Sequence, residues 1–478
     1  MSLMVLFSPI DFSSSGFELY VLLAAFVFVL LSWVWLFIRS LHSHMNTPII
    51  KNSSNMIENK KLSFNQPFVS VIVPARNEED NIGKCLLSIL MQEYPNFEVV
   101  AVDDNSDDQT LKIMKDICSK QAFSKKLKVV SLSSKPDGWT GKTWASQQGY
   151  MNSHGDILLF TDADSLFESK YTIELTVRQL LSDKLDALTG IPYLPLIDFW
   201  SKIVMPVWSL YSEVFDRGIA DANDPQSRVA FVMGSFFMVK RVVFEAIDTY
   251  KSVKDEIQED RAIGNLLKTS QYRMKMFKVD SLVSALWSRD ISSLWHGIRR
   301  SVTPAVVEYK SAIISHQLIL FAMIALPFFL LPYNAVMLYG KSSYSLPPSI
   351  VAAIPNIIPT PPHASSVAQQ HNIQNSILNH EVALNPANKE ESYLKSTLLW
   401  FDLLLCLLIM AATSIKGVMK YRLVPLYSVL CFIGGLFLIA SYTYSTLPLL
   451  TGFSMRPIKW RGRPHHVPSH YSEKNKTI

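Results

Sequence analysis

Charged residues and cysteine are both scarce in this sequence. Asp, Glu, Lys and Arg make up only 18% of the 478 residues, whereas 49% are hydrophobic. This composition is unusual for a wholly soluble protein, and the length exceeds what one hydrophobic core organises, so we expect a soluble domain plus a second, differently built part. The four cysteines, Cys85, Cys118, Cys406 and Cys431, have no metal-ligand spacing, which argues against a zinc site and against a disulfide framework.

A strong net charge is also absent, because the excess of basic residues is only +5. The basic residues gather near apolar runs, at Arg299, Arg300, Lys416, Lys420, Arg422 and in the tail from Arg456 to Arg463. This distribution suits anionic lipid headgroups better than nucleic acid. We therefore expect a lipid bilayer as a partner and no nucleic acid.

Four long apolar runs account for the hydrophobic excess. They lie at residues 21–38, 313–337, 396–415 and 423–450. A helix of about 20 apolar residues crosses a hydrocarbon layer of roughly 30 Å, so each run predicts a membrane helix. The first run is too long for the apolar part of a secretory signal, and we interpret it as a retained anchor.

Basic residues predict which side of the membrane each part occupies. Arg39 and Lys51 follow the first run, whereas the charged residues before it are acidic. This bias places the soluble domain in the cytoplasm, and we expect an integral protein of the plasma membrane. Four crossings would leave the basic tail outside, against the same rule, so one run is expected to be interfacial or re-entrant. Its prolines make the run at 313–337 one candidate.

Composition divides the chain into four regions. We expect an anchor region at residues 1–66, a soluble domain at 67–304, further membrane helices at 305–455 with a polar loop at 341–391, and a basic tail at 456–478.

Short β-branched runs alternate with helical periodicity in the soluble domain. Strands are predicted at residues 69–73, 97–102, 126–132 and 156–161. Strands that alternate with helices predict an α/β fold with a mainly parallel sheet covered on both faces. Ser106 and Gln109 are expected to form a capping box for the helix after the second strand.

An Asp-Ala-Asp sequence directly follows the fourth predicted strand. Asp162 and Asp164 can bring oxygens onto one Mg²⁺ or Mn²⁺, which keeps its other positions for water and diphosphate oxygens. Taken alone, such a pair is more typical of a surface turn. Its place after a buried strand favours the metal site, because ligands bind beyond the carboxyl ends of parallel strands.

Polar residues also end the first two strands. Asp103 and Asp104 are placed to bind the base or ribose of a nucleotide, although capping of the next helix also explains them. Pro74, Asn77 and Glu78 lie where a helix start offers N–H groups to an anionic ligand. An ordinary strand-to-helix turn explains this second cluster equally well.

These motifs, in this order, resemble the signatures of family-two inverting glycosyltransferases with the GT-A fold. They are Val71-Ile72-Val73-Pro74-Ala75-Arg76-Asn77-Glu78, Val102-Asp103-Asp104-Asn105-Ser106-Asp107-Asp108 and Thr161-Asp162-Ala163-Asp164. A narrower resemblance, to the membrane-bound branch that glycosylates carotenoids, is carried by Gly138-Trp139-Thr140-Gly141-Lys142, Glu259-Asp260 and Trp460-Arg461-Gly462-Arg463. The likeness covers residues 67–304 and extends to the tail.

The resemblance implies roles that spacing alone leaves open. Asp103 or Asp104, together with Lys142, would hold the nucleotide, and the Asp-Ala-Asp acids would hold the metal beside it. Asp260 would be the general base that takes the proton of the acceptor hydroxyl. Without the resemblance, the acidic run around Asp260 is more typical of a solvated helix start.

The sequence departs from the family pattern at the segment that usually embraces the diphosphate, Gln-x-x-Arg-Trp. In its place stands Leu294-Trp295-His296-Gly297-Ile298-Arg299-Arg300. Arg299 is expected to contact the diphosphate, since guanidinium groups bind such oxygens in a bidentate manner. The competing interpretation, favoured for Arg300, is a basic pair that contacts lipid headgroups. The missing motif argues against processive polymerisation.

Acceptor recognition is expected on an aromatic segment with few charges, residues 199–215. The segment either lines an acceptor groove at the membrane surface, lies on the interface as an amphipathic helix, or packs inside the domain. Gly234 belongs to a segment that resembles the family's acceptor-side strand, where glycine permits close approach.

The sequence thus predicts a metal-dependent hexosyltransferase. It would move a hexose, glucose from UDP-glucose being favoured, to a hydroxyl or carboxyl of a membrane lipid such as a carotenoid. The alternatives within this class are polyprenyl phosphate, a glycerolipid or a polysaccharide as acceptor. The alternative outside it is a catalytically inactive membrane protein that binds nucleotide sugars, against which the intact Asp162, Asp164 and Asp260 argue.

Overall fold

The computed structural model describes residues 14–52, 66–215, 218–227, 229–308, 313–339, 386–451, 458–460 and 463–465. They belong to two compact units, the first made of Met1–Trp35 and Leu318–Ala412, the second of Leu36–Gln317 and Thr413–Ile478. Most of the predicted loop at 341–391 and of the tail at 456–478 lies outside the described residues. The end of that loop, from Pro386 onward, is helical instead.

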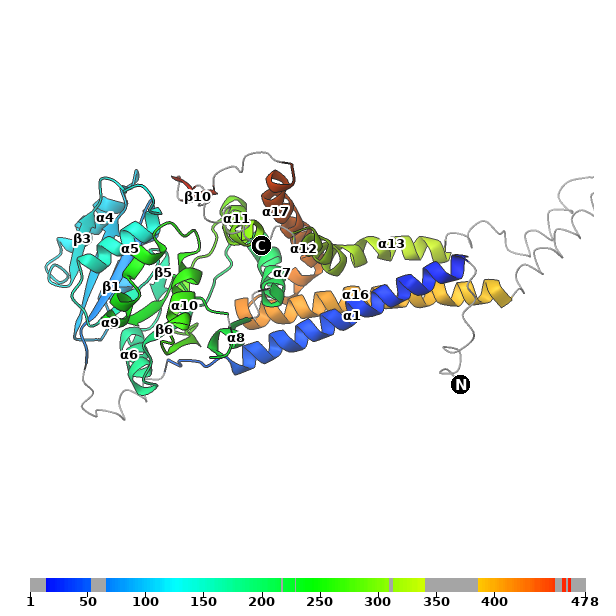
Figure 1. The fold of residues 1–478 in the computed structure, drawn as a ribbon, viewed down its shortest axis with the longest axis horizontal. Helices are drawn as coiled ribbons and strands as arrows, with labels where there is room; N and C mark the ends of the chain where they lie inside the picture. Colours follow the sequence, from blue (N-terminus) through cyan, green and yellow to red (C-terminus); the bar gives the residue numbers. More distant parts are fainter. Residues whose placement is uncertain are drawn as a thin grey trace, which may run out of the picture. The chain divides into compact units, whose positions relative to one another are not determined.

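The second unit holds all the strands and most of the helices (Figure 1). Its strands are β1 (Val69–Ala75), β2 (Phe97–Asp103), β3 (Leu127–Ser131), β4 (Ile157–Phe160), β5 (Ser165–Phe167), β6 (Ala187–Ile191), β7 (Phe237–Lys240), β8 (Met274–Lys278), β9 (Val283–Ala285), β10 (Ile458–Trp460) and β11 (Arg463–His465). Its helices are α3 (Ile82–Leu90), α4 (Thr110–Cys118), α5 (Gly141–Met151), α6 (Thr172–Ser182), α7 (Phe199–Phe215), α8 (Gly218–Asn223), α9 (Arg241–Ala246), η2 (Thr249–Val253), α10 (Glu259–Thr269), α11 (Ile291–Glu308), η7 (Pro425–Leu430) and α17 (Cys431–Thr451).

The central sheet has strand order β3-β2-β1-β4-β7-β6-β8. Neighbouring strands are parallel except at β7, which is antiparallel to both β4 and β6. The four predicted strands correspond to β1, β2, β3 and β4. The mainly parallel α/β sheet predicted from the alternation of strands and helices is therefore confirmed.

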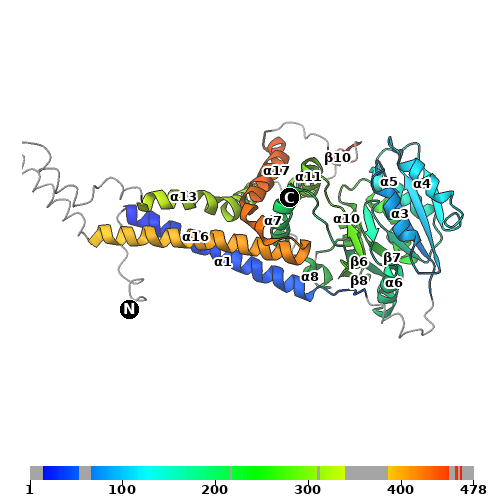
Figure 2. The same ribbon diagram turned by 180° about the vertical axis from the view of Figure 1, so that it is seen from behind.

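Helices cover both faces of this sheet (Figure 2). Val71 and Val73 of β1 belong to an apolar cluster that includes the buried sides of α3, α4 and α6. Ile72, which lies between them, belongs instead to the cluster formed with Phe244 of α9 and Leu267 of α10. Successive side chains of a strand point to opposite faces, so one β-branched run supplies both cores.

The helix after β2 begins differently from the prediction. α4 starts at Thr110, whose N–H donates to Asp108 Oδ1 at 2.9 Å. Ser106 Oγ accepts instead from the N–H of Asn77, at 3.1 Å. The predicted capping box was wrong because Ser106 joins the loop after β2 to the loop after β1.

One edge of the sheet is covered by the segment that follows the first helix, α1 (Ser14–Asn46). The N–H of Ile50 donates to the carbonyl of Lys278 in β8 at 3.0 Å, and the N–H of Lys278 donates to the carbonyl of Pro48 at 2.8 Å. The end of α1 is held as well, since Arg39 forms an ion pair of 2.7 Å with Asp221 of α8. The segment and the helix end therefore belong to the second unit.

The first unit is helical. It contains the start of α1, most of α16 (Pro386–Tyr421), the end of α12 (Ile313–Leu320), a π-helical turn η4 (Phe321–Ala325) and α13 (Leu326–Tyr339). Pro327 has no N–H for the carbonyl four residues earlier, that of Met323. Trp33 Nε1 of α1 donates to that carbonyl at 2.8 Å, which joins α1 to the turn.

The predicted apolar runs are helical except for residues 423–424 at the start of the last one, and four helices are long and apolar enough to cross a membrane. These are Leu23–Asn46, Gln317–Val336, Ser392–Tyr421 and Pro425–Leu447.

Candidate active site

A cavity of about 650 Å³ lies in the second unit beyond the ends of β1 and β4. Its polar wall comes from the loops after these strands and from α10, and its opposite wall from α7, α11 and the end of α16. Six of the ten site residues predicted from the sequence line it: Pro74, Glu78, Lys142, Asp162, Asp164 and Asp260. The cavity thus unites residues that are far apart in the chain.

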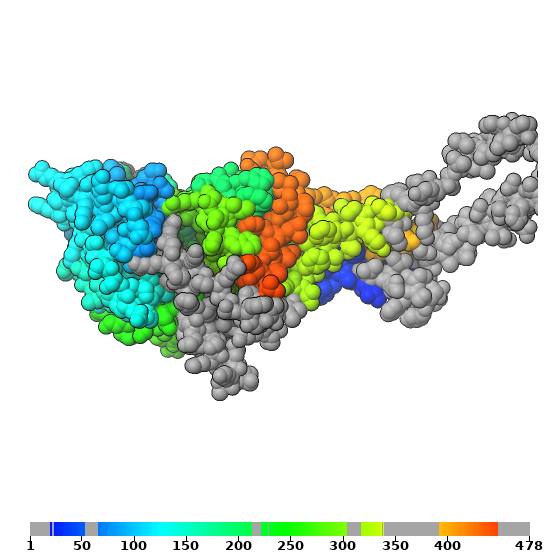
Figure 3. Space-filling view, turned by 90° about the horizontal axis from the view of Figure 1, so that it is seen from above, coloured from blue at the N-terminus to red at the C-terminus, as the bar shows by residue number. Residues whose placement is uncertain are grey.

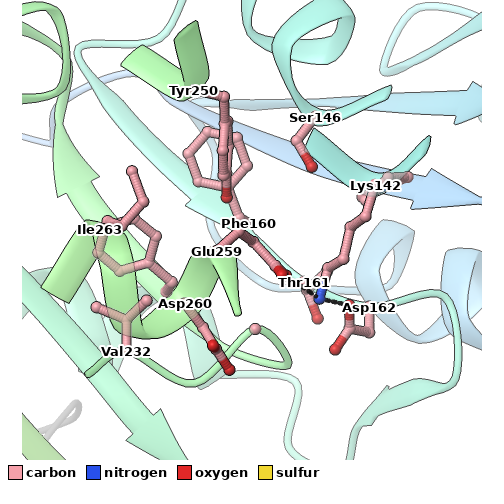
Figure 4. Close-up of a pocket in the computed structure, with 13 residues that line it drawn as sticks. Lys142, Ser146, Phe160, Thr161, Asp162, Val232, Tyr250, Glu259, Asp260 and Ile263 are labelled. Atoms are coloured by element: carbon pink, nitrogen blue, oxygen red, sulfur yellow. Dashed lines mark ion pairs between the residues drawn. The ribbon is translucent and has the colours of Figure 1, made fainter. Parts of the chain in front are cut away.

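Lys142 lines the cavity and points toward Asp162 (Figure 4). The Thr140 side chain caps the start of α5 by accepting from the N–H of Thr143, which fixes the turn that carries Lys142. Lys142 Nζ lies 2.8 Å from Asp162 Oδ1 and 3.0 Å from Glu259 Oε1. Burial alone would lower the pKa of Lys142, but the carboxylates of Asp162 and Glu259 outweigh it and hold this pKa well above its usual value.

A glycine allows this arrangement. A Cβ atom placed on Gly234 would lie 2.6 Å from Lys142 Nζ and 3.3 Å from Asp162 Oδ2. Any side chain at this position would therefore push the ammonium group away from its carboxylates. The sequence predicted that Gly234 permits a close approach, and the group that approaches it is the ammonium group of Lys142.

Asp260 lies in the first turn of α10, beside Glu259. Its Oδ1 accepts from the N–H of Arg261 at 2.8 Å. Burial, followed by the neighbouring charge of Glu259, raises the pKa of Asp260 to about 6, although Lys142 opposes the shift. A carboxyl group with such a pKa is ionised at pH 7 and yet basic enough to accept a proton.

Asp162 and Asp164 end β4 and line the same wall. Burial and then the charges of Asp164, Glu78 and Asp162 raise the pKa of the Cys85 thiol. The described residues contain no cluster of three or more His, Cys, Asp or Glu side chains able to enclose a metal. Two carboxylates facing a cavity fit Mg²⁺ or Mn²⁺ that takes its other ligands from water and a diphosphate.

The loop after β1 contributes Pro74, Arg76 and Glu78 to the cavity. Glu78 pairs with Arg289 at 2.7 Å, and Arg289 also pairs with Asp80 at 3.0 Å. Sequence reasoning missed Arg289, because the strand before it, β9, is too short to produce a recognisable pattern.

Three predicted donor residues lie beside the cavity wall without lining it. Asp103 and Asp104 are buried at the end of β2, and Asp103 Oδ2 accepts from the N–H of Ser106 at 3.3 Å. Arg76 lines the cavity and also contacts the loop after β2, because its Nη1 donates to the carbonyl of Asp104 at 2.7 Å. Asn77 has a positive φ of 52° and its Oδ1 accepts from the N–H of Asp107 at 2.9 Å.

The two arginines of α11 point in different directions. The Arg299 guanidinium lies 4.6 Å from the centre of the Tyr444 ring, in α17, and does not line the cavity. Arg300 does line it. The predicted diphosphate contact, Arg299, therefore lies outside the cavity lining, and its neighbour Arg300 belongs to it.

Apolar side chains line the cavity as well. Leu194, Met205, Trp208, Met233, Leu286 and Trp287 contribute to it, and His296 and Lys420 add polar groups. Met205 and Trp208 belong to α7, the aromatic segment that the sequence left open as acceptor groove, interfacial helix or packing element. Part of α7 does line the cavity.

Comparisons with known proteins agree with this architecture. Residues 70–248 match the family model described as glycosyl transferase family 2. The 4,4'-diaponeurosporenoate glycosyltransferase of Staphylococcus aureus (strain N315) is 26% identical over 275 residues, which cover 54% of this chain and 70% of that protein. The corresponding protein of strain bovine RF122 / ET3-1 is 26% identical over 252 residues, 52% of this chain and 64% of that protein.

The chain is also similar to proteins of solved structure. The mannosyltransferase PcManGT from Pyrobaculum calidifontis, in complex with GDP-Man and Mn²⁺, is 16% identical with a TM-score of 0.41, covering 80% of this chain and 98% of that one. S. aureus TarS 1-349 with UDP-GlcNAc is 17% identical with a TM-score of 0.34, covering 84% and 99%. The family match, together with the strand order, confirms the GT-A fold predicted from the motifs.

Proposed function

Residues 70–248 form a domain of glycosyl transferase family 2, and from this premise we propose that the chain is an inverting hexosyltransferase that acts on a membrane lipid. Its donor would be a nucleotide-diphosphate sugar, with UDP-glucose favoured. Its acceptor would be a carotenoid or a related isoprenoid, a proposal supported by the kinship with the diaponeurosporenoate enzymes. The observation that carries the proposal is one cavity whose lining combines the carboxyl group of Asp260 with cations and with apolar side chains such as Met205 and Trp208.

The charged wall would bind the donor. Lys142 and Arg300 would contact the diphosphate, because both are cations that line the cavity beside the acidic end of β4. Asp162 and Asp164 would hold Mg²⁺ or Mn²⁺, which when bound neutralises charge on the departing nucleoside diphosphate. The loop after β1 would contact the nucleoside, and Asp104 would position its Arg76, which donates to the Asp104 carbonyl.

The transfer itself would be a direct displacement. The acceptor oxygen forms a bond to the anomeric carbon as the bond from that carbon to the diphosphate breaks, and Asp260 takes the hydroxyl proton. The raised pKa of Asp260 supports a hydroxyl acceptor, since an ionised carboxylate acceptor would need no base. The apolar side chains of Met205 and Trp208 would contact the lipid chain next to the reacting group.

The membrane helices would hold the enzyme in the plasma membrane with its catalytic domain in the cytoplasm, where nucleotide sugars are available. Support comes from the basic residues Arg39 and Lys51 after the first apolar run.

The test is incubation of membranes that contain the full-length chain with a panel of labelled nucleotide sugars, followed by lipid extraction and mass analysis. A lipid that gains one hexose mass supports the proposal. Asp162→Ala should abolish the gain while the protein stays folded, whereas Asp116→Ala, on the exposed side of α4, should leave it unchanged. Transfer at the wild-type rate by Asp162→Ala would contradict the metal role.

A further inference from the structure

Helix α17 is long and apolar enough to cross a membrane, yet it lies beside α7 of the catalytic unit (Figure 3). A Cβ atom on Gly434 would come within 2.2 Å of the carbonyl oxygen of Ile203, so the two backbones touch. Further along both helices, the Tyr442 and Tyr211 rings are 5.4 Å apart. The helices therefore run in the same direction and stay together over these turns.

Helix α7 cannot cross a bilayer, because both of its ends belong to the catalytic domain. It follows β6 of the central sheet, and it leads into α8. Asn223 of α8 is bound to Met276 of β8 by two hydrogen bonds, one donated by Asn223 Nδ2 at 2.9 Å and one by the Met276 N–H at 2.7 Å. A helix aligned with α7 occupies the same depth relative to the membrane.

Both ends of α17 also lie on the side of the catalytic cavity. Lys420 and Tyr421, shortly before α17, line the cavity. After α17, strand β10 lies against α11, whose His296 and Arg300 line the same cavity. The chain therefore leaves the cavity side and returns to it without an intervening crossing.

Aromatic contacts fix α17 to α11 as well as to α7. Phe437 packs 5.4 Å from Trp295, and Tyr444 lies 5.8 Å from the same indole and beneath the Arg299 guanidinium. Gln317 Nε2 donates to the Thr446 hydroxyl near the end of the helix. In a helix that crossed the membrane on its own, these side chains would face lipid or other membrane helices. In α17 they pack against residues of the catalytic unit.

We propose that α17 does not cross the bilayer but lies in the leaflet on the catalytic side, as an outer support of the cavity wall formed by α7 and α11. The chain then crosses three times, through α1, through α12 and α13, and through α16. Its partner surface is the boundary between headgroups and acyl chains, which covers the exposed Leu426, Val429 and Leu447.

With four crossings the basic tail would lie outside, although basic residues favour the cytoplasmic side of a membrane. Three crossings remove this conflict. Arg39 and Lys51 after α1, Lys416 and Lys420 at the end of α16, and the basic tail all fall on the cytoplasmic side. The run suspected from its prolines, at residues 313–337, is then a true crossing. The re-entrant element is instead the last apolar run.

The experiment compares two epitope tags in the full-length chain. One follows the last residue, and the other is inserted at Gln121, in the exposed turn between α4 and β3. Protease is added to intact spheroplasts and, in parallel, to opened membranes. Both tags should survive in spheroplasts and be lost from opened membranes, whereas a tag before α1 should be lost from both samples.

Opposite fates of the C-terminal tag and the Gln121 tag in one sample would overturn the proposal, since four crossings require them to be on different sides. Shared fates exclude four crossings even if the whole chain is inserted in the opposite sense, because the prediction concerns the two tags relative to each other. A third tag within residues 341–391 identifies the run that does not cross: it should lie on the side opposite to the Gln121 tag. A position on the same side would overturn the proposal, since residues 313–337 would then be the non-crossing run. The measurement does not depend on sugar transfer, so it stands independently of the proposed activity.

Discussion

Replacement of Asp260 by asparagine separates the catalytic cost of this carboxyl group from its structural cost. The amide keeps the shape of the side chain but cannot take a proton. Loss of a general base typically lowers a rate by about 10² to 10⁴-fold, and we expect Asp260→Asn to lower hexose transfer at pH 7 by that factor. The substitution should also make the protein more stable.

The stability gain follows from the direction of the pKa shift. The pKa of Asp260 is raised in the folded protein from 3.8 to about 6, so the folded state binds this proton more tightly than the unfolded state. The contribution is present below pH 3.8 and is lost as the pH rises through about 6. Raising this pKa from 3.8 to about 6 corresponds to about 3 kcal/mol at most, part of which water in the cavity screens.

The assay combines two readouts on purified protein. Wild-type turnover should rise between pH 5 and pH 7, because a group with a pKa of about 6 is ~10% ionised at the lower pH and ~90% at the higher. Thermal unfolding at pH 7 should occur at a higher temperature for Asp260→Asn than for the wild type. Asp116→Asn makes the same chemical change on the exposed side of α4, outside the cavity, and should alter neither readout.

Two results would refute this reasoning. If Asp260→Asn transferred sugar at more than about a tenth of the wild-type rate, Asp260 would not be the base. If the variant were inactive but unfolded at a lower temperature than the wild type, the loss of activity would reflect structural damage. The ionised Asp260 carboxyl group would then not destabilise the wild-type protein.

Further predictions concern Lys142, Asp164 and Gly434. Lys142→Met leaves the carboxylates of Asp162 and Glu259 without their cation. We expect weaker donor binding in calorimetry and a loss of about 3–5 kcal/mol in the free energy of unfolding by denaturant. Unchanged donor affinity would exclude the contact between Lys142 and the diphosphate. Chelation should stop transfer until Mg²⁺ or Mn²⁺ is added, and Asp164→Asn should raise the cation concentration that gives half the maximal rate; full activity in excess chelator would exclude the metal. Gly434→Ala should destabilise the protein by about 1–3 kcal/mol through its clash with the Ile203 carbonyl, while Gly417→Ala, whose Cβ has room at 3.7 Å from its neighbours, should not.

The strand pattern predicted the sheet and part of the site. Parallel strands end at one edge, which is why Pro74, Glu78, Asp162 and Asp164 were expected to converge before any contact was known. Lys142 and Asp260 had no such positional argument, and only the resemblance to the family singled them out. Their partner Glu259 lies far from Lys142 in the sequence, so no local pattern indicates the pair.

Helix phase explains the arginine that the sequence assigned differently. Adjacent residues of a helix point about 100° apart, so one of Arg299 and Arg300 had to face away from the cavity, but the sequence does not show which face of α11 is turned inward. Hydropathy has a similar limit for α17. It shows that the helix is apolar, but it does not show whether lipid or protein covers it. The buried face of α17 carries the small or polar residues Gly434, Ser441 and Ser445 next to the apolar Leu438.

The pairing of the chain around Ile50 with β8 has a consequence for the solubility of the domain. An exposed strand at the end of a sheet offers its free N–H and carbonyl groups to any other chain and so promotes aggregation. Here the stretch that leaves α1 occupies that position, through the hydrogen bonds between Lys278 and its neighbours Pro48 and Ile50. A chain shortened to begin at Pro67 would lose this cover together with the anchor, so self-association of such a fragment would reflect an unprotected strand as much as a missing membrane.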